Sequence, residues 1–185
     1  MRVLLHACCG PCATYPVDAL AAEGIETRLF FYNPNIHPFQ EFEKRLEAVK
    51  ELSKKRDVPL IVDDDYDLEG WLRKMVFRES KRCSICYETR LARAARLAKK
   101  SGFDAFTTSL LFSKQQYHDR IRDLAEAVAE EVGIPFLYRD FREGYKAGVE
   151  SSKAMGLYRQ EYCGCIYSER DRFHGKVREV GNERC

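Results

Sequence analysis

No segment of the sequence approaches the ~20 consecutive apolar residues that a membrane-spanning helix needs. Neither sign of charge dominates, since 31 basic residues stand against 29 acidic ones and the formal net charge is +2. Such a balance neither requires nor excludes a nucleic-acid partner. Repeats, low-complexity runs and Gly/Ser linkers are also absent, so the 185 residues predict one globular domain with no membrane partner.

The first residues give no sign of export. Their apolar run is too short for a signal peptide, and no small-residue cleavage site follows it before Cys8. We therefore expect a cytoplasmic, reducing location. The eight cysteines, about 4% of the chain, fall below the roughly 8–10% of a disulfide scaffold. In a reducing compartment they indicate metal or redox chemistry rather than structural disulfides.

Short β-forming runs alternate along the chain with stretches in which apolar residues have helical spacing. The predicted strands cover residues 2–7, 27–32, 59–62, 103–108 and 135–138. The predicted helices cover residues 14–23, 39–56, 68–77, 87–100, 119–132 and 145–155. This alternation predicts an α/β fold, a three-layer sandwich whose central sheet is mostly parallel. The domain is expected to span residues 1–168, with residues 169–185 as a charged C-terminal tail.

In a sheet of this kind, ligands bind beyond the carboxyl ends of the strands. Residue types that bind metals or RNA gather at those ends. They are Cys8, Cys9 and Cys12 after the first predicted strand, Asn33, Asn35 and His37 after the second, Ser109 and Ser113 after the fourth, and Asp140 and Arg142 after the fifth. We expect these side chains to share one cleft. By contrast, the basic run from Lys44 to Arg56 is interpreted mainly as the polar face of a helix.

Seven of the eight cysteines fall into three short motifs. The motifs are Cys8-Cys9-Gly10-Pro11-Cys12, Cys83-Ser84-Ile85-Cys86 and Cys163-Gly164-Cys165. Cys185 stands apart from them, and we expect it to be a free surface thiol. The motifs leave three hypotheses open: a thiol–disulfide oxidoreductase, a structural zinc protein and an iron–sulfur protein.

The three hypotheses use the cysteines differently. A thioredoxin-like enzyme would use Cys9 and Cys12, because a helix start lowers the pKa of a thiol in a Cys-x-x-Cys pair, but this leaves the other motifs unexplained. Structural zinc would take four thiolates from the second and third motifs and leave the first idle. An iron–sulfur cube also needs four thiolates. Because seven thiols exceed four, this last hypothesis implies a second metal or a redox-active pair beside the cluster.

Longer motifs surround the cysteines. They are His6-Ala7-Cys8-Cys9-Gly10-Pro11-Cys12, Phe31-Tyr32-Asn33-Pro34-Asn35-Ile36-His37-Pro38, Arg82-Cys83-Ser84-Ile85-Cys86-Tyr87, Phe106-Thr107-Thr108-Ser109-Leu110, Asp140-Phe141-Arg142 and Leu157-Tyr158-Arg159-Gln160-Glu161-Tyr162-Cys163-Gly164-Cys165. Together they resemble the QueH type of epoxyqueuosine reductase, from about residue 1 to residue 168. This combination is specific, and the residues after Ser168 lie outside the pattern.

The resemblance implies the HUP fold, that of the adenine-nucleotide α-hydrolase-like proteins. It implies an enzyme that removes the epoxide oxygen of epoxyqueuosine, at the wobble nucleotide of a tRNA anticodon loop, in the last step of queuosine synthesis. It further implies a [4Fe–4S] cluster, a second mononuclear iron and an electron donor that the sequence does not identify. ATP use is not expected, because the Cys-Cys-Gly-Pro-Cys motif stands where ATP-using relatives carry a Ser-Gly-Gly-x-Asp-Ser loop.

The resemblance also suggests roles for single residues. The expected thiolate ligands are Cys8, Cys9, Cys12, Cys83, Cys86, Cys163 and Cys165. Asp140 is expected as an oxygen ligand of iron, with a helix cap or an ion pair with Arg142 as the equal alternative. The expected proton donors are His6, Tyr32 or Tyr162, each of which a packed structural role would explain as well. The expected RNA contacts are Asn33, His37, Arg82, Arg90, Ser113, Lys114, Tyr117, Arg142, Tyr158 and Arg159.

Overall fold

The computed structural model describes residues 1–174. Four parallel strands form the central sheet in the order β3-β2-β1-β4. Their bounds are β1 (Arg2–His6), β2 (Glu26–Tyr32), β3 (Leu60–Asp63) and β4 (Ala105–Thr108). Residues 3–6 of β1 are fully buried, as expected of a central parallel strand that helices cover on both faces. The predicted α/β sandwich with a parallel sheet is confirmed.

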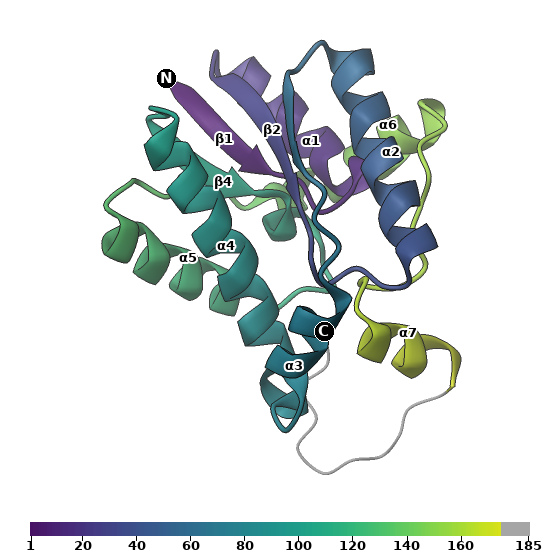
Figure 1. The fold of residues 1–185 in the computed structure, drawn as a ribbon. Helices are drawn as coiled ribbons and strands as arrows, with labels where there is room; N and C mark the ends of the chain where they lie inside the picture. Colours follow the sequence, from purple (N-terminus) through teal and green to yellow (C-terminus); the bar gives the residue numbers. More distant parts are fainter. Residues whose placement is uncertain (175–185) are drawn as a thin grey trace.

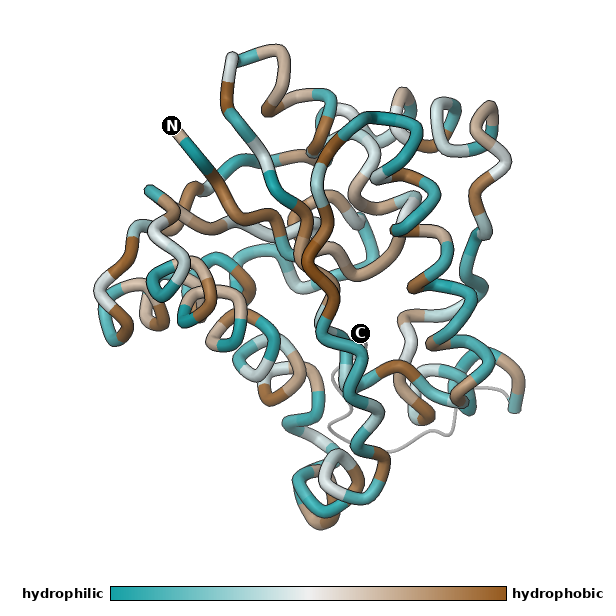
Figure 2. Tube along the Cα trace, turned by 45° about the horizontal axis from the view of Figure 1, so that its top comes forward, coloured by the Kyte–Doolittle hydropathy of each residue, from teal (hydrophilic) through white to brown (hydrophobic). Residues whose placement is uncertain are grey.

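Helices cover both faces of this sheet (Figure 1). One face carries α1 (Gly10–Ala22), α2 (Phe39–Arg56) and α6 (Tyr145–Ala154), and the other carries α4 (Arg82–Lys100) and α5 (His118–Val132). Beyond the carboxyl ends of the strands lie α3 (Leu68–Met75) and α7 (Ile166–Phe173). Apolar residues concentrate along the strands in the middle of the molecule (Figure 2). The strand order reverses between β1 and β4, which places the ligand cleft at their carboxyl ends.

Two helices begin earlier than predicted, and both early turns carry cysteines. α1 begins at Gly10 instead of residue 14, and α4 begins at Arg82 instead of residue 87. The apolar periodicity starts only after these turns, because ligand-type residues occupy them. Cys9 caps α1 through a hydrogen bond from Cys12 N to its Sγ (3.4 Å), and Pro11 suits the first turn, where a missing N–H costs nothing.

The predicted fifth strand at residues 135–138 is wrong. Only one bridge forms there, with hydrogen bonds from Phe106 N to Pro135 O (3.1 Å) and from Leu137 N to Phe106 O (2.8 Å). Pro135 has no N–H to extend a ladder, and the chain turns away into the short 3₁₀ helix η3 (Phe141–Gly144). Asp140 therefore caps η3 instead of following a strand.

The predicted domain boundary at residue 168 falls within α7. Helix α7 continues to Phe173, and Asp171 in it pairs with the buried Arg82 of α4 at 2.9 Å. The rest of the predicted tail, residues 175–185 with Cys185, lies outside the described residues. Within residues 1–174 no helix is both long enough and apolar enough to cross a bilayer.

Candidate metal centre

The first cysteine group consists of Cys8, Cys9 and Cys12, between the end of β1 and the first turn of α1. Their Sγ atoms lie within 4.8 Å of one another, and those of Cys8 and Cys9 are 3.9 Å apart. Two thiolates on one tetrahedral metal are about 3.8 Å apart, because a zinc-type metal–sulfur bond measures about 2.3 Å. Ser109, which follows β4, fixes Cys8: its Oγ accepts from Cys8 N (3.0 Å) and donates to Cys8 Sγ (3.3 Å). This group can therefore hold a metal ion.

Negative charge is distributed unequally in the first cysteine group. The pKa of Cys8 lies well below its usual range, because the thiols of Cys12 and Cys9 hydrogen-bond to its thiolate. Burial raises the pKa of Cys9, and the hydrogen bond with Cys8 raises that of Cys12. Within the group, the thiolate form is thus favoured at Cys8 and disfavoured at Cys9 and Cys12.

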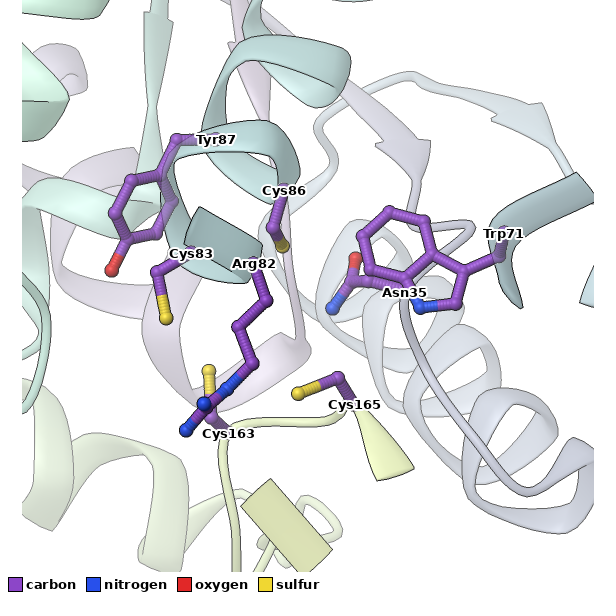
Figure 3. A pocket seen from close by; sticks show the side chains of 8 residues that line it. All are labelled: Asn35, Trp71, Arg82, Cys83, Cys86, Tyr87, Cys163 and Cys165. Atoms are coloured by element: carbon purple, nitrogen blue, oxygen red, sulfur yellow. The ribbon is translucent and has the colours of Figure 1, made fainter. Parts of the chain in front are cut away.

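The second cysteine group joins two distant parts of the chain. Cys83 and Cys86 stand on the first turns of α4, and Cys163 and Cys165 on the loop that leads into α7. Figure 3 shows their sulfur atoms pointing into one space between α4 and this loop. The pocket is lined by Asn35, Trp71, Arg82, Cys83, Cys86, Tyr87, Cys163 and Cys165. Four cysteine sulfur atoms around one pocket match the donor set of a four-iron cluster once the disulfide bond of Cys83 is reduced.

Burial disfavours the thiolate form of two cysteines in this group, Cys86 and Cys163. Burial raises the pKa of Cys86 to about 12 and also raises the pKa of Cys163. A bound metal removes such protons, since only the thiolate is a good ligand. The second cysteine group is therefore suited to holding metal rather than to free thiol chemistry at neutral pH.

Two polar atoms in the pocket have no hydrogen-bond partner among the described residues. They are the indole nitrogen of Trp71 and the carboxamide oxygen of Asn35, on side chains that are 3% and 1% exposed. A buried polar group without a partner is costly, and native structures keep few of them. Figure 3 shows both side chains next to each other, beside Cys86 and Cys165. A bound group with sulfur atoms would accept the indole hydrogen, so the pocket fits an iron–sulfur cluster.

Arg90 lies between the two cysteine groups. It is 2% exposed, and it donates from Nη2 to Cys86 Sγ (2.9 Å) and from Nε to Cys86 O (3.2 Å). Its charge interacts with Cys86, Cys163 and Cys8, and no carboxylate of the described residues pairs with it. Burying an uncompensated cation costs several kcal/mol, so thiolates must supply the opposite charge. Arg90 therefore favours thiolate charge in the cysteine groups that it lies between.

Arg45 of α2 fixes the loop of the second cysteine group. Its guanidinium donates from Nη1 to Cys163 O (2.8 Å) and from Nη2 to Tyr162 O (2.9 Å), and Nε pairs with Glu41 at 2.7 Å. The Tyr158 hydroxyl donates to the other oxygen of Glu41 at 2.5 Å. Because Arg45 is 1% exposed, its interpretation as part of a polar helix face is wrong. Its position on the apolar stripe that includes Phe42 was the available sequence signal.

Two glutamines donate hydrogen bonds to sulfur. Gln160 Nε2 lies 3.0 Å from Cys9 Sγ and 3.4 Å from Cys12 Sγ, and Gln116 Nε2 lies 3.3 Å from Cys163 Sγ. Each group thus receives one amide donor. Gln160 comes from the segment that also carries the third motif, so this segment contacts both cysteine groups. No spacing rule in the sequence marks either glutamine.

The chain is similar in sequence to a family of enzymes over most of its length. A family model described as Epoxyqueuosine reductase QueH matches residues 3–171. The chain is 38% identical over 172 residues to an epoxyqueuosine reductase QueH of Dehalococcoides mccartyi, with 93% of this chain and 94% of that protein covered. It is 34% identical to the QueH of Thermotoga maritima, with 95% of each covered. The chain belongs to the QueH epoxyqueuosine reductase family.

The fold has a counterpart among solved structures. A chain of Methanocaldococcus jannaschii, described as a predicted subunit of tRNA methyltransferase, superposes with a TM-score of 0.57 at 12% identity. The match covers 83% of this chain and 74% of that one. At this identity the likeness shows the fold alone, and it bears out the HUP-like sandwich that the QueH resemblance implied.

Both cysteine groups of this QueH-family chain leave out three residues with predicted chemical roles. They are the expected proton donors His6 and Tyr32 and the expected oxygen ligand Asp140. His6 is buried, with Nδ1 2.9 Å from Thr108 Oγ1 and Nε2 3.1 Å from Tyr32 O, and burial lowers its pKa to about 4. The Tyr32 ring lies between Phe30 and Arg93, and burial raises the pKa of its hydroxyl. His6 therefore has the packed structural role that was the alternative to proton donation.

Asp140 is a helix cap and an ion-pair partner of Arg142, the alternative to its expected role as an iron ligand. It pairs with Arg142 at 2.5 Å and caps η3 by accepting from Arg142 N at 3.1 Å. The Arg142 side chain is the main reason why the pKa of Asp140 is lowered to about 2. Its other charged neighbour is His118, and neither cysteine group is among its contacts. The expectation of an oxygen ligand at this position has no support in the geometry.

Four of the predicted RNA contacts are buried and cannot meet an RNA backbone at the surface. They are Asn33, His37, Arg82 and Arg90. Tyr162, the third expected proton donor, gives its hydroxyl hydrogen to His37 O at 2.6 Å. Residue type does not reveal this burial, and contact of the four residues with RNA stays an untested prediction.

The remaining RNA candidates are partly or fully exposed. They are Ser113, Lys114, Tyr117, Arg142, Tyr158 and Arg159. Lys114 lies over the Tyr145 ring, and Tyr158 is engaged with Glu41. The loop from Ser113 to Tyr117 reaches the second cysteine group through Gln116. An RNA role for this loop remains a prediction.

Proposed function

We propose that this chain reduces epoxyqueuosine to queuosine in tRNA, at the wobble nucleotide of the anticodon loop. The observation that carries the proposal is that the first cysteine group, with three cysteines, and the second, with four, lie at one end of the sheet. The buried Arg90 lies between them. Removing the epoxide oxygen takes two electrons and two protons and yields an alkene and water. Because no side chain supplies such electrons, the site must hold a redox cofactor.

The two cysteine groups suit two different metals. We assign a [4Fe–4S] cluster to Cys83, Cys86, Cys163 and Cys165, and a single iron to the first cysteine group. When bound, the cluster passes single electrons from an outside donor, and the neighbouring iron acts as a Lewis acid toward the epoxide oxygen. We infer that this donor meets the enzyme in the cytoplasm and that ATP takes no part.

The residues around the metals have separable tasks. Arg90 balances thiolate charge on both groups, and Arg45 holds the loop of the second group against α2. Gln116 and Gln160 donate hydrogen bonds to ligand sulfur, which stabilises the more negative states. The lowered pKa of Cys8 favours its thiolate form, which suits this residue to bind the single iron.

No geometry favours the thioredoxin-like alternative. That chemistry needs a thiolate at Cys9 or Cys12, but both of these thiols have raised pKa values. A structural zinc in the second cysteine group would leave the first cysteine group, whose sulfur atoms lie within 4.8 Å of one another, without a role. Metal analysis after anaerobic purification separates these hypotheses, since only the proposed function requires iron.

The deciding experiment uses tRNA that carries epoxyqueuosine. Protein reconstituted with iron and sulfide under anaerobic conditions is mixed with this tRNA and dithionite, and the nucleosides are analysed by mass spectrometry. We expect a mass loss of one oxygen with the wild type and none with Cys163→Ser. Lys100→Gln, at the far end of α4, serves as the matched control and should react normally. Unchanged epoxyqueuosine with fully loaded wild-type protein would reject the assignment.

A further inference from the structure

Phe77, in the turn between α3 and α4, has an unusual backbone and an unusual exposure. The side chain is 95% exposed, and the backbone has a φ of +61°. Left-handed backbone is unfavourable for a bulky residue and suits glycine. The ring is too exposed for core packing to explain it. A strained, fully exposed aromatic ring is therefore the kind of feature that a binding role explains.

The segment around Phe77 is basic and apolar on its outside. Residues 72–81, which we call the α3 surface, carry four exposed basic side chains and one exposed acidic one: Arg73, Lys74, Arg78, Lys81 and Glu79. Leu72 and Val76 are exposed beside Phe77, at 36% and 46%. Figure 1 shows α3 and its turn projecting beyond the sheet at the end of the molecule that holds the cysteines.

The inner side of this segment belongs to the cysteine pocket. Trp71 and Met75 point inward and pack with Cys86. Trp71, just before the segment, and Cys83, just after its end, both line the pocket. A ligand held on the outer side therefore lies next to the second cysteine group.

We propose that the α3 surface docks the single-stranded loop of the RNA substrate, with Phe77 stacking on an unpaired base. This inference rests on the proposed function, because it takes an RNA loop as the substrate. Proteins that bind unpaired nucleotides combine exposed aromatic rings, on which bases stack, with cations that meet the phosphates. The α3 surface offers both, and its excess of positive charge complements a polyanion.

The test measures RNA binding rather than reduction. The probes are a labelled anticodon stem-loop RNA and a fully paired RNA duplex of equal length. Phe77→Gly should weaken stem-loop binding about five- to a hundredfold, the effect of losing one base–aromatic stack, and leave duplex binding unchanged. Its Tm should stay equal or rise, because glycine suits the backbone of this turn. Phe77→Trp should keep wild-type affinity.

Charge and control variants complete the test. Lys74→Gln should lower the slope of log Kd against log salt by about one, the contribution of one phosphate contact, whereas Lys100→Gln should leave it unchanged. Equal stem-loop affinity in Phe77→Gly and wild type overturns the proposal. So does an equal loss on the duplex, or a fall in Tm that accounts for the loss. A chain that binds the stem-loop as expected but leaves epoxyqueuosine intact contradicts the proposed function and not the docking surface.

Discussion

Arg90 is a buried cation in contact with the sulfur of Cys86, which we propose as a cluster ligand, so its charge should act directly on the electrons of a bound cluster. A unit charge about 6 Å away contributes roughly 3 kcal/mol at an effective dielectric constant of about 20, on the order of 100 mV for one electron. We expect Arg90→Gln to lower the reduction potential by about this amount, because the positive charge favours the reduced state. Potentials are measured by redox titration with electron paramagnetic resonance.

Arg93 on the same helix is the matched control. It pairs with Asp63 at 2.7 Å and is half exposed, so Arg93→Gln should shift the potential little. Equal potentials in Arg90→Gln and Arg93→Gln would contradict a charge role for Arg90. The pair of variants thus separates a local charge effect from a general loss of packing in α4.

Trp71 is the single tryptophan of the chain, so tryptophan fluorescence, excited at a wavelength that tyrosine does not absorb, comes from the pocket of the second cysteine group. We expect iron and sulfide loading to quench this fluorescence in proportion to cluster content. Trp71→Phe keeps an aromatic ring but removes the N–H, so it should load normally and have a potential lower by tens of mV, since a hydrogen bond to sulfur favours the reduced cluster. Fluorescence that is unchanged by full loading would place the cluster elsewhere.

The short helix η3 explains the position of Asp140, a residue that the sequence suggested as an iron ligand, because Asp140 caps this helix. Asp140→Asn keeps a capping side chain but removes the ion pair with Arg142. Both partners are about 40% exposed, so we expect a loss of only ~0.5–1 kcal/mol in the free energy of unfolding at pH 7. Because the folded-state pKa is depressed to about 2, this contribution is present above pH 4 and is lost as the pH falls toward 2.

Urea unfolding at pH 7 and at lower pH measures this loss, and the wild type and Asp140→Asn should converge as the pH falls toward 2. Reduction of epoxyqueuosine should proceed at the wild-type rate in the variant. A large loss of rate with unchanged stability would instead place the carboxylate at the metal.

Helix and strand positions followed from the sequence wherever apolar residues set the period. The helix at 39–56 agrees with its prediction at both ends, and β1 and β2 agree to within one residue. The first turns of α1 and α4 were missed because cysteines replace the apolar residues that reveal a helix. The false strand at 135–138 came from β-forming composition, which does not report whether a neighbouring ladder can continue past Pro135.

At the scale of the whole molecule, the sequence predicted one cleft with seven thiols but could not divide them. The division into three and four depends on which loop packs against which helix. Arg45 sets that packing through two backbone carbonyls of the third motif, and its buried role does not follow from residue type. Long-range contacts of this kind have no local period in the sequence, so only the folded chain reveals them.

The division of the seven cysteines into groups of three and four predicts that each metal can be lost without the other. Cys163→Ser should remove the cluster and lower the iron content from about five to about one per chain, since a cube holds four irons. Cys8→Ser should keep about four irons together with the spectrum of the cluster, because its Sγ belongs to the other group. Iron analysis and electron paramagnetic resonance on reconstituted protein measure both. If either serine variant lost all five irons while its Tm in the metal-free state stayed at the wild-type value, the two groups would form one inseparable centre, and Arg90 would lie at its middle rather than between two.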